Sequence, residues 1–243
     1  MNMIILLTDF GQGEYAGVMK GVIYNIDPNA EIVDLCHNIS PQNIIEASWL
    51  LKNNYKYFPE GATFCCVVDP GVGTQRKALA VRTGNYYFVA PDNGLLWETL
   101  KGQQIIDIRQ MPIPKDASRT FHGRDVFAKA AANISLGHFD GLGRKIEQIE
   151  RLELYQGPGE GLIARIDRFG NIITNLPKQD KNTYSVEIEQ QSYQMNFYPN
   201  YDMAQNDELF LIEGSCNTLE ISLKNGNAND KLRVTAGTKI KIT

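Results

Sequence analysis

The chain has 243 residues, 43% hydrophobic and 21% charged, which suffices for one large core or two unequal domains. Its net charge of −4 at pH 7 argues against nucleic acids and anionic membrane surfaces as partners, because both favour basic patches. No apolar run approaches the length of a membrane span, and the amino-terminal MNMIILLTDF lacks the basic region and cleavage site of a signal peptide.

The first third of the chain alternates strand and helix patterns. Residues 3–10 are a continuous apolar run that ends in an aspartate, as expected for a strand buried on both faces. Residues 14–26 carry apolar side chains at helical spacing, and the DPN that follows ends the helix. A strand at 30–37, a helix at 44–58 and a strand at 62–69 complete a β-α-β-α-β order. This order predicts a parallel sheet with helices on both faces.

The next segments are predicted to be shorter strands and a helix. Strands are expected at 77–83, 85–90 and 103–110, the first two joined by a tight Gly-Asn connection. A helix is expected from about residue 123 to about 136. Residues 1–155 are therefore predicted to form a mostly parallel α/β sandwich domain.

The carboxyl-terminal part, residues 156–243, carries almost no helical pattern. Beyond a polar, glycine-rich stretch around 140–160, several segments alternate apolar and polar residues with turn signals between them. The fold class predicted is α/β, with the N-terminal sandwich followed by a smaller all-β domain, an antiparallel sheet or barrel.

The four cysteines are predicted to be buried free thiols. Cys65 and Cys66 are adjacent on a predicted strand and point to opposite faces, so they do not share a partner easily. Cys36 and Cys216 complete the set, and no C-x-x-C spacing occurs. This usage is typical of a reducing compartment and favours the cytoplasm.

Three aspartates stand at the carboxyl ends of predicted strands, where open α/β sheets bind their ligands. They are Asp9 in LLTDFG, Asp69 in VVDPGVG and Asp92 in VAPDNG, each followed closely by glycine. A single aspartate of this kind more often caps a turn. Three of them in one domain favour a site.

The stretch SRTFHGRD contains His122, one of only three histidines, followed by Arg124 and Asp125. It precedes the apolar run VFAKAAANI, where a helix is expected. Two interpretations are open: His122 caps the helix, or it is a catalytic group held at the mouth of that helix.

A metal-dependent hydrolase is kept as an alternative. Asp9, Asp69, Asp92, His122 and Asp125 would make a respectable ligand set, although no paired histidines occur. The glycines of DPGVGTQR fit neither a dinucleotide fingerprint nor a P-loop, and no G-x-S-x-G elbow occurs around the serine of GSCN.

The sequence resembles the S-adenosyl-L-methionine hydroxide adenosyltransferases, a family related to fluorinating and chlorinating enzymes. Seven stretches carry the resemblance, in order from residue 6 to about residue 222. They are LLTDFG with YAGVMKGVI, IVDLCHNISPQNI, VVDPGVGTQRKALAV, APDNGLL, TFHGRDVFAKAAA, IDRFGNIITN and EGSCNTLEIS. Together they cover nearly the whole chain.

The resemblance implies hydrolysis of S-adenosylmethionine to adenosine and methionine, by attack of water at C5′ of the ribose. No cofactor and no metal are implied. It implies that Asp69, Arg76 and His122 handle the water. It also implies a homotrimer, with each site between the N-terminal domain of one subunit and the C-terminal domain of its neighbour.

For the substrate, the resemblance implies that Asp9 binds the ribose hydroxyls and that Asp167 binds the methionine ammonium. Asn171 falls near the adenine, and Ser215 falls where the halogenating relatives contact the methionine carboxylate. Phe169 either covers the adenine or belongs to the core.

Two further functions are alternatives to hydrolysis: halogenation, and binding without turnover. The halogenating relatives have a tyrosine in place of Asp69, and a carboxylate there would repel a halide, so hydrolysis is favoured over halogenation. A protein that binds adenosine or S-adenosylmethionine with little turnover stays an alternative, although such a binder has no need of a water-handling set.

Overall fold

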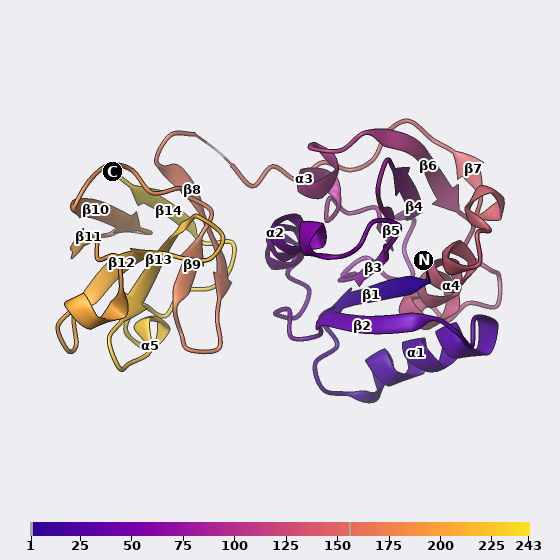
Figure 1. The fold of residues 1–243 in the computed structure, drawn as a ribbon, viewed down its shortest axis with the longest axis horizontal. Coiled ribbons are helices and arrows are strands. Elements are labelled where there is room, and N and C mark those ends of the chain that lie inside the picture. Colours follow the sequence, from indigo (N-terminus) through magenta and orange to yellow (C-terminus); the bar gives the residue numbers. More distant parts are fainter. Residues whose placement is uncertain (1, 156) are drawn as a thin grey trace. The chain divides into compact units, whose positions relative to one another are not determined.

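The computed structural model describes residues 2–155 and 157–243 (Figure 1). The chain divides into two compact units, Met1–Leu152 and Glu153–Thr243, and each has its own sheet.

The sheet of the first unit has seven strands in the order β2-β1-β3-β5-β4-β6-β7. Their bounds are β1 Met3–Thr8, β2 Glu31–Cys36, β3 Thr63–Val67, β4 Ala78–Thr83, β5 Tyr87–Pro91, β6 Ile105–Met111 and β7 Arg144–Lys145. All six strands predicted in this unit are present. The strands β2, β1, β3 and β5 are parallel, as predicted.

The prediction of a mostly parallel sheet is wrong for the other half. β4 pairs antiparallel with both β5 and β6, and β6 pairs antiparallel with β7. The cause is the tight Gly-Asn turn after β4, which Thr83 closes with a 2.9 Å hydrogen bond from its N–H to the carbonyl of Tyr86. Such a short connection forces the two strands to run in opposite directions.

Helices cover both faces of this sheet. α1 (Glu14–Ile26) and α4 (Ala128–Ser135) share a core with alternate residues of β1 and β3, among them Leu6 and Cys65. α2 (Ile44–Asn54) and the short α3 (Trp97–Leu100) contact each other and belong to the opposite face (Figure 1). The predicted helix at 44–58 ends earlier, and a 3₁₀ turn, η1 (Tyr55–Tyr57), follows it.

All four cysteines are free, as predicted, but only two of them are buried. Cys65 and its neighbour Cys66 lie on β3 in the middle of the sheet, and burial raises the pKa of the Cys65 thiol to about 12. Cys36 ends the edge strand β2, and Cys216 lies in a turn, so both are partly exposed.

The second unit is a seven-stranded antiparallel sheet in the order β11-β10-β14-β8-β9-β13-β12. The strands are β8 Glu160–Ile166, β9 Ile172–Thr174, β10 Thr183–Ile188, β11 Gln191–Asn196, β12 Leu209–Glu213, β13 Leu219–Leu223 and β14 Lys239–Ile242. A single bridge between Phe197 and Leu211 links the two outer strands, so the sheet is nearly a closed barrel. This confirms the predicted sheet or barrel. One short helix, α5 (Ala228–Leu232), follows β13.

No helix in the part of the chain that the structure describes is long and apolar enough to cross a membrane.

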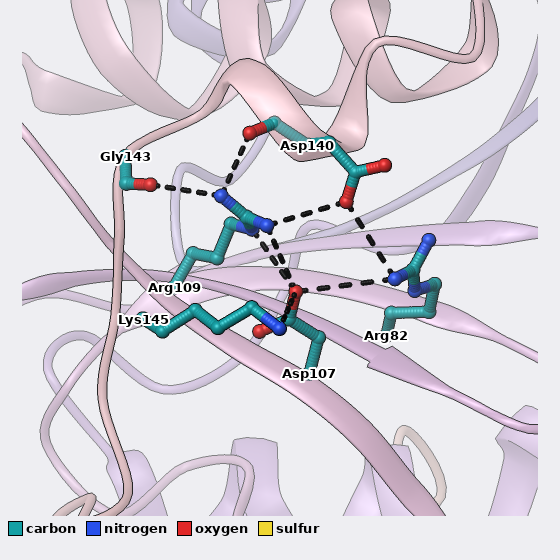
Figure 2. A network of polar contacts seen from close by, with 6 residues as sticks. All are labelled: Arg82, Asp107, Arg109, Asp140, Gly143 and Lys145. Carbon is teal, nitrogen blue, oxygen red and sulfur yellow. Dashed lines mark hydrogen bonds and ion pairs between the residues drawn. The ribbon is translucent and has the colours of Figure 1, made fainter.

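A network of charges at the edge of the first sheet surrounds the buried carboxylate of Asp107 (Figure 2). Arg109 contacts it at 3.0 Å, Lys145 at 3.6 Å and Arg82 at 3.9 Å. The two guanidinium groups also lie over the ring of Phe139, 5.0 Å and 5.6 Å from its centroid. Asp107 therefore neutralises cations that join β4, β6 and β7.

We expect Asp107→Asn to lower the free energy of unfolding by about 2–4 kcal/mol, because partly buried cations lose their counter-charge. Arg109 keeps its hydrogen bonds to the carbonyls of Asp140 and Gly143, which limits the loss. The matched control is Asp140→Asn, since this side chain is 73% exposed and its ion pairs are worth less than about 1 kcal/mol. Chemical denaturation of the three proteins measures both values, and equal losses in the two variants would contradict the assignment.

Candidate active site

A cavity of about 500 Å³ opens at the carboxyl ends of β1 and β3, which are parallel neighbours in the sheet. Asp9 directly follows β1, Asp69 follows β3, and His122 stands at the start of the helical segment formed by a π turn, η2 (Gly123–Phe127), and α4. Further wall residues are Phe10, Tyr15, Pro41, Gln42, Val67, Val72, Ser118, Thr120, Phe121, Gly123 and Arg124. The structure thus brings three predicted site residues to one cavity.

Arg76 holds the Asp69 carboxylate through a two-pronged ion pair. Its Nε lies 2.9 Å from Oδ1 and 3.1 Å from Oδ2, and its Nη2 also donates to Oδ2. Both side chains are almost fully buried. Bidentate pairing fixes the orientation of both partners.

The loop between these two residues is a chain of tight turns that returns Arg76 to Asp69. Val72 donates its N–H to the carbonyl of Asp69 at 3.2 Å. Gly73 has a φ of +77°, and a Cβ at this position would overlap the carbonyl oxygen of Arg119. Glycine is therefore required here, both for the backbone angle and for the close approach of the segment that carries His122.

His122 does not cap the helix, since its side chain makes no capping hydrogen bond. Its Nδ1 instead lies 2.7 Å from Nη2 of Arg76. A guanidinium group has donors only, so Nδ1 accepts this hydrogen bond and the proton of the neutral ring is on Nε2. Burial and the charge of Arg76 lower the pKa of His122, although Asp69 and Asp125 raise it. The imidazole is therefore neutral at pH 7.

We expect activity to fall at acid pH with a midpoint below 6.5, the ordinary pKa of histidine, because protonating Nδ1 breaks its contact with Arg76. The same shift makes folding more stable as the pH rises through this window, since the unfolded chain binds the proton more tightly. The profile of kcat/KM against pH measures the midpoint. An NMR titration, with His122→Asn to identify the signal, assigns it. A midpoint above 6.5 would contradict the arrangement.

Two aspartates of the predicted set have structural roles. Asp125 pairs with Arg124 at 2.8 Å and accepts the N–H of Ser118 at 2.8 Å, which closes the turn before the helix. Asp92 is buried outside the cavity, where it pairs with Lys77 at 3.4 Å. Within residues 2–155 and 157–243, no three His, Cys, Asp or Glu side chains come together as a metal site would require. The ligand set suggested by the sequence is therefore not assembled.

Three aromatic rings form an apolar wall that the sequence analysis did not single out. Tyr15 and Phe121 have centroids 5.0 Å apart, and Phe10 lies 5.6 Å and 5.8 Å from them. In the sequence, Phe10 directly follows Asp9 and Phe121 directly precedes His122, which is the pattern that could have identified these two rings. Asp9 itself accepts the N–H of Gln42 at 2.8 Å, which leaves further lone pairs of its carboxylate for a ligand.

In the second unit, Asp167 and Asn171 form one hydrogen-bonded turn between β8 and β9. Oδ1 of Asp167 accepts the N–H groups of Phe169 at 2.8 Å and Asn171 at 2.9 Å, and Oδ2 accepts the Asn171 side-chain amide at 2.9 Å. Phe169 is 74% exposed, which excludes the core role considered for it. An exposed ring on a rigid turn is free to cover a ligand.

The turn between β12 and β13 carries Ser215, whose side chain is exposed. Beside it lies Glu220, a buried carboxylate that the sequence analysis missed. Burial raises the pKa of Glu220 to about 7, and the charge of Asp167 adds to the effect. The predicted residues thus fall into two groups: Asp9, Asp69, Arg76 and His122 in the first unit, and Asp167, Phe169, Asn171 and Ser215 in the second.

Comparison with known proteins decides the family. Residues 4–143 match the model of the N-terminal domain of S-adenosyl-L-methionine hydroxide adenosyltransferases, and residues 161–241 match that of the C-terminal domain. The chain belongs to this family. The resemblance drawn from the seven sequence stretches is confirmed.

Two curated hydrolases and a solved structure are similar over nearly the full chain, and a fluorinase is similar over about three quarters of it. A (R)-S-adenosyl-L-methionine hydrolase of Thermus thermophilus is 34% identical over 100% of both chains, and one of Methanocaldococcus jannaschii is 34% identical over 96% of this chain and 93% of its own. A fluorinase of Nocardia brasiliensis is 24% identical over 73% of this chain and 72% of its own. The crystal structure of an uncharacterized conserved protein from Thermotoga maritima superposes with a TM-score of 0.89 at 34% identity, over 99% of this chain and 100% of that one.

Proposed function

We propose that this protein hydrolyses S-adenosyl-L-methionine to adenosine and L-methionine, by attack of water at C5′ of the ribose. The observation that carries the proposal is the Asp69–Arg76–His122 set at the wall of the cavity. A protein that only binds this ligand has no need of a buried carboxylate, guanidinium and imidazole arranged around a water position. Full-length relatives at 34% identity are hydrolases of this substrate.

The geometry divides the handling of the water between two side chains. Oδ1 of Asp69 accepts one hydrogen bond from Arg76, whereas Oδ2 accepts two, so Oδ1 retains a lone pair that can accept a proton of the water. His122 presents Nε2–H and donates to the water oxygen, because its Nδ1 is occupied by Arg76. His122 therefore orients the water, and Asp69 is the base. Arg76 positions both.

The reaction then needs little acid catalysis. The oxygen–C5′ bond forms as the C5′–sulfur bond breaks, and its electron pair goes to the sulfonium, which leaves as the neutral thioether of methionine. The proton lost by the water passes through Asp69 to solvent. The aromatic wall of Phe10, Tyr15 and Phe121 suits a sulfonium cation, since ring faces attract positive charge.

The substrate-binding roles follow the chemistry of the groups present. Asp9 offers two oxygens for the vicinal hydroxyls of ribose, and the exposed Phe169 suits the adenine. Asn171 is buried and its side-chain amide donates to Asp167 and Tyr201, so it meets the adenine only through its Oδ1, as an acceptor. Ser215 is free to bind the methionine carboxylate. Asp167 supports the methionine ammonium. No cofactor takes part.

We also propose that the protein acts as a homotrimer in the cytoplasm, with each site formed by the N-terminal domain of one subunit and the C-terminal domain of its neighbour. The four free cysteines favour a reducing compartment. Mixing His122→Ala with a variant altered in Asp167 tests the shared site, because mixed trimers regain some intact sites. Absence of recovered activity in a mixed trimer would contradict it.

The test of the function is incubation of chelator-treated protein with S-adenosylmethionine, with adenosine and methionine followed by chromatography. Release of both in equal amounts is expected. A ligand-induced rise in melting temperature without products would overturn hydrolysis and favour a binding protein.

A further inference from the structure

Glu220 is a buried acid in the second unit without a partner of its own. It is the second residue of β13, where the directly opposite residues are Ile173 on β9 and Ile212 on β12. The residue is only 9% exposed. In the described chain, no side chain or backbone group donates a hydrogen bond to its carboxylate or forms an ion pair with it. Such a group is costly to bury unless a ligand completes it.

The Glu220 carboxylate points to the turn that carries Ser215. A Cβ on Gly214 would overlap Oε1 of Glu220, so the carboxylate lies directly against the backbone of this turn. The charge of Asp167 reaches it from the β8–β9 turn and helps to raise its pKa. The other titratable groups on neighbouring elements are Tyr201, Asp202, Glu213 and Arg168, which are exposed, and Cys216 and Arg165, which are partly buried. Arg165 on β8 lies opposite Ile173, as Glu220 does on β13, so both are on the same face of the sheet.

Asp167 alone has little capacity left for a cation. Its carboxylate already accepts three hydrogen bonds from Phe169 and Asn171, which leaves one free lone pair. A primary ammonium group has three N–H donors to satisfy. The Glu220 carboxylate, by contrast, accepts no hydrogen bond in the described chain. Because Gly214 has no side chain, this carboxylate lies against the turn that carries Ser215, where the methionine part of the substrate is expected to bind.

We propose that Glu220 is a second binding carboxylate for the α-ammonium of the substrate's methionyl part, beside Asp167. The inference rests on the proposed function, because S-adenosylmethionine supplies this ammonium. The Asp167 carboxylate stabilises the β8–β9 turn and accepts one hydrogen bond from the ammonium. Glu220 accepts the remaining hydrogen bonds and provides the negative charge that neutralises the ammonium. The pair selects a substrate with a free α-ammonium against one in which this group is absent or acylated.

Glu220 should therefore release its proton when the ammonium of S-adenosylmethionine binds. Free Glu220 is partly protonated near pH 7, and a bound cation favours its charged form. Calorimetric titration with S-adenosylmethionine at pH 7, in two buffers that differ in ionisation enthalpy, counts the protons released. We expect release of about half a proton per site. Hydrolysis of the substrate would add its own heat to the measurement. The titration therefore uses the full-length Asp69→Asn variant, and the further substitutions are made in this variant.

On that background, Glu220→Gln is expected to weaken S-adenosylmethionine binding at least about tenfold and to abolish proton release, while adenosine binding is unchanged. Gly214→Ala, which displaces the carboxylate, should weaken S-adenosylmethionine in the same way. Glu213→Gln, an exposed acid at the end of β12, is the matched control and should bind like the parent. Unchanged affinity and proton release in Glu220→Gln would overturn the proposal.

The outcomes separate this proposal from the function. If the native protein forms no adenosine but Glu220→Gln still loses the proton-linked binding, hydrolysis fails and the ammonium site holds. If the native protein is active and Glu220→Gln binds normally, only the ammonium site fails. Equal weakening of adenosine and S-adenosylmethionine by Glu220→Gln would also overturn it, since adenosine has no α-ammonium.

Discussion

Replacing Asp69 with asparagine is expected to lower the hydrolysis of S-adenosylmethionine by about 10²–10⁴-fold, the usual contribution of a positioned base. Asparagine keeps the shape of the side chain but replaces one oxygen by a donor group. It cannot take a proton from the water, and it leaves Arg76 without the charge that fixes its two-pronged pairing. The orientation of His122 depends on Arg76, so both water contacts are affected.

The matched control is Asp92→Asn. Asp92 is also a buried aspartate just after a strand, and it also has a cationic partner, but it lies outside the cavity. Rates of adenosine formation and adenosine-induced changes in melting temperature are measured for both variants. We expect Asp69→Asn to bind adenosine and lose turnover, and Asp92→Asn to keep turnover. Similar activity losses in both variants would show that Asp69 matters for folding alone.

The sequence predicts correctly that Asp9 and Asp69 lie close together, because the geometry of a parallel sheet determines where strand ends meet. Asp9 and Asp69 follow β1 and β3, and parallel neighbours place their carboxyl ends at the same edge. His122 stands at the start of the helical segment that follows a turn, and its approach to the cavity depends on how this segment packs on the sheet. A local sequence pattern does not show such packing. Arg76, the partner of His122, was implied by the family resemblance. The turn at Gly73, whose positive φ allows the loop to bring Arg76 back to Asp69, is visible only in the structure.

The alternation rule explains why Glu220 was missed. Along β13, Leu219, Ile221 and Leu223 face the barrel core, so the intervening Glu220 and Ser222 are expected on a solvated face. Both are nevertheless buried. A second apolar cluster on this unit, formed by Ala204, Phe210, Ile212 and Tyr198, shows that chain beyond β11 covers part of the outer surface. Segments that are distant in the sequence cover this surface, so the residues around Glu220 do not indicate that it is buried.

The contribution of Glu220 to the stability of the second unit should fall as the pH rises from about 4.5 to about 7, opposite in sign to the contribution of His122 in the first unit. The pKa of Glu220 is raised from 4.5 to about 7 in the folded protein, so the unfolded chain has already lost the proton in this window while the folded chain holds it. The contribution is fully present below pH 4.5 and lost above about 7. Its size is roughly 1–3 kcal/mol, a value reduced for the solvent that still reaches the group.

Glu220→Gln removes this titration, so we expect the variant to be more stable than the native protein at pH 8 and similar to it at pH 4. Both tryptophans, Trp49 and Trp97, lie in the first unit, so their fluorescence does not report on β13. Native-state hydrogen exchange, read on peptides from the second unit, measures the difference where it arises. A variant less stable at pH 8 would mean that the carboxylate has a partner in the free protein. Greater stability combined with weaker substrate binding is the pattern expected of a charge that is kept for its ligand.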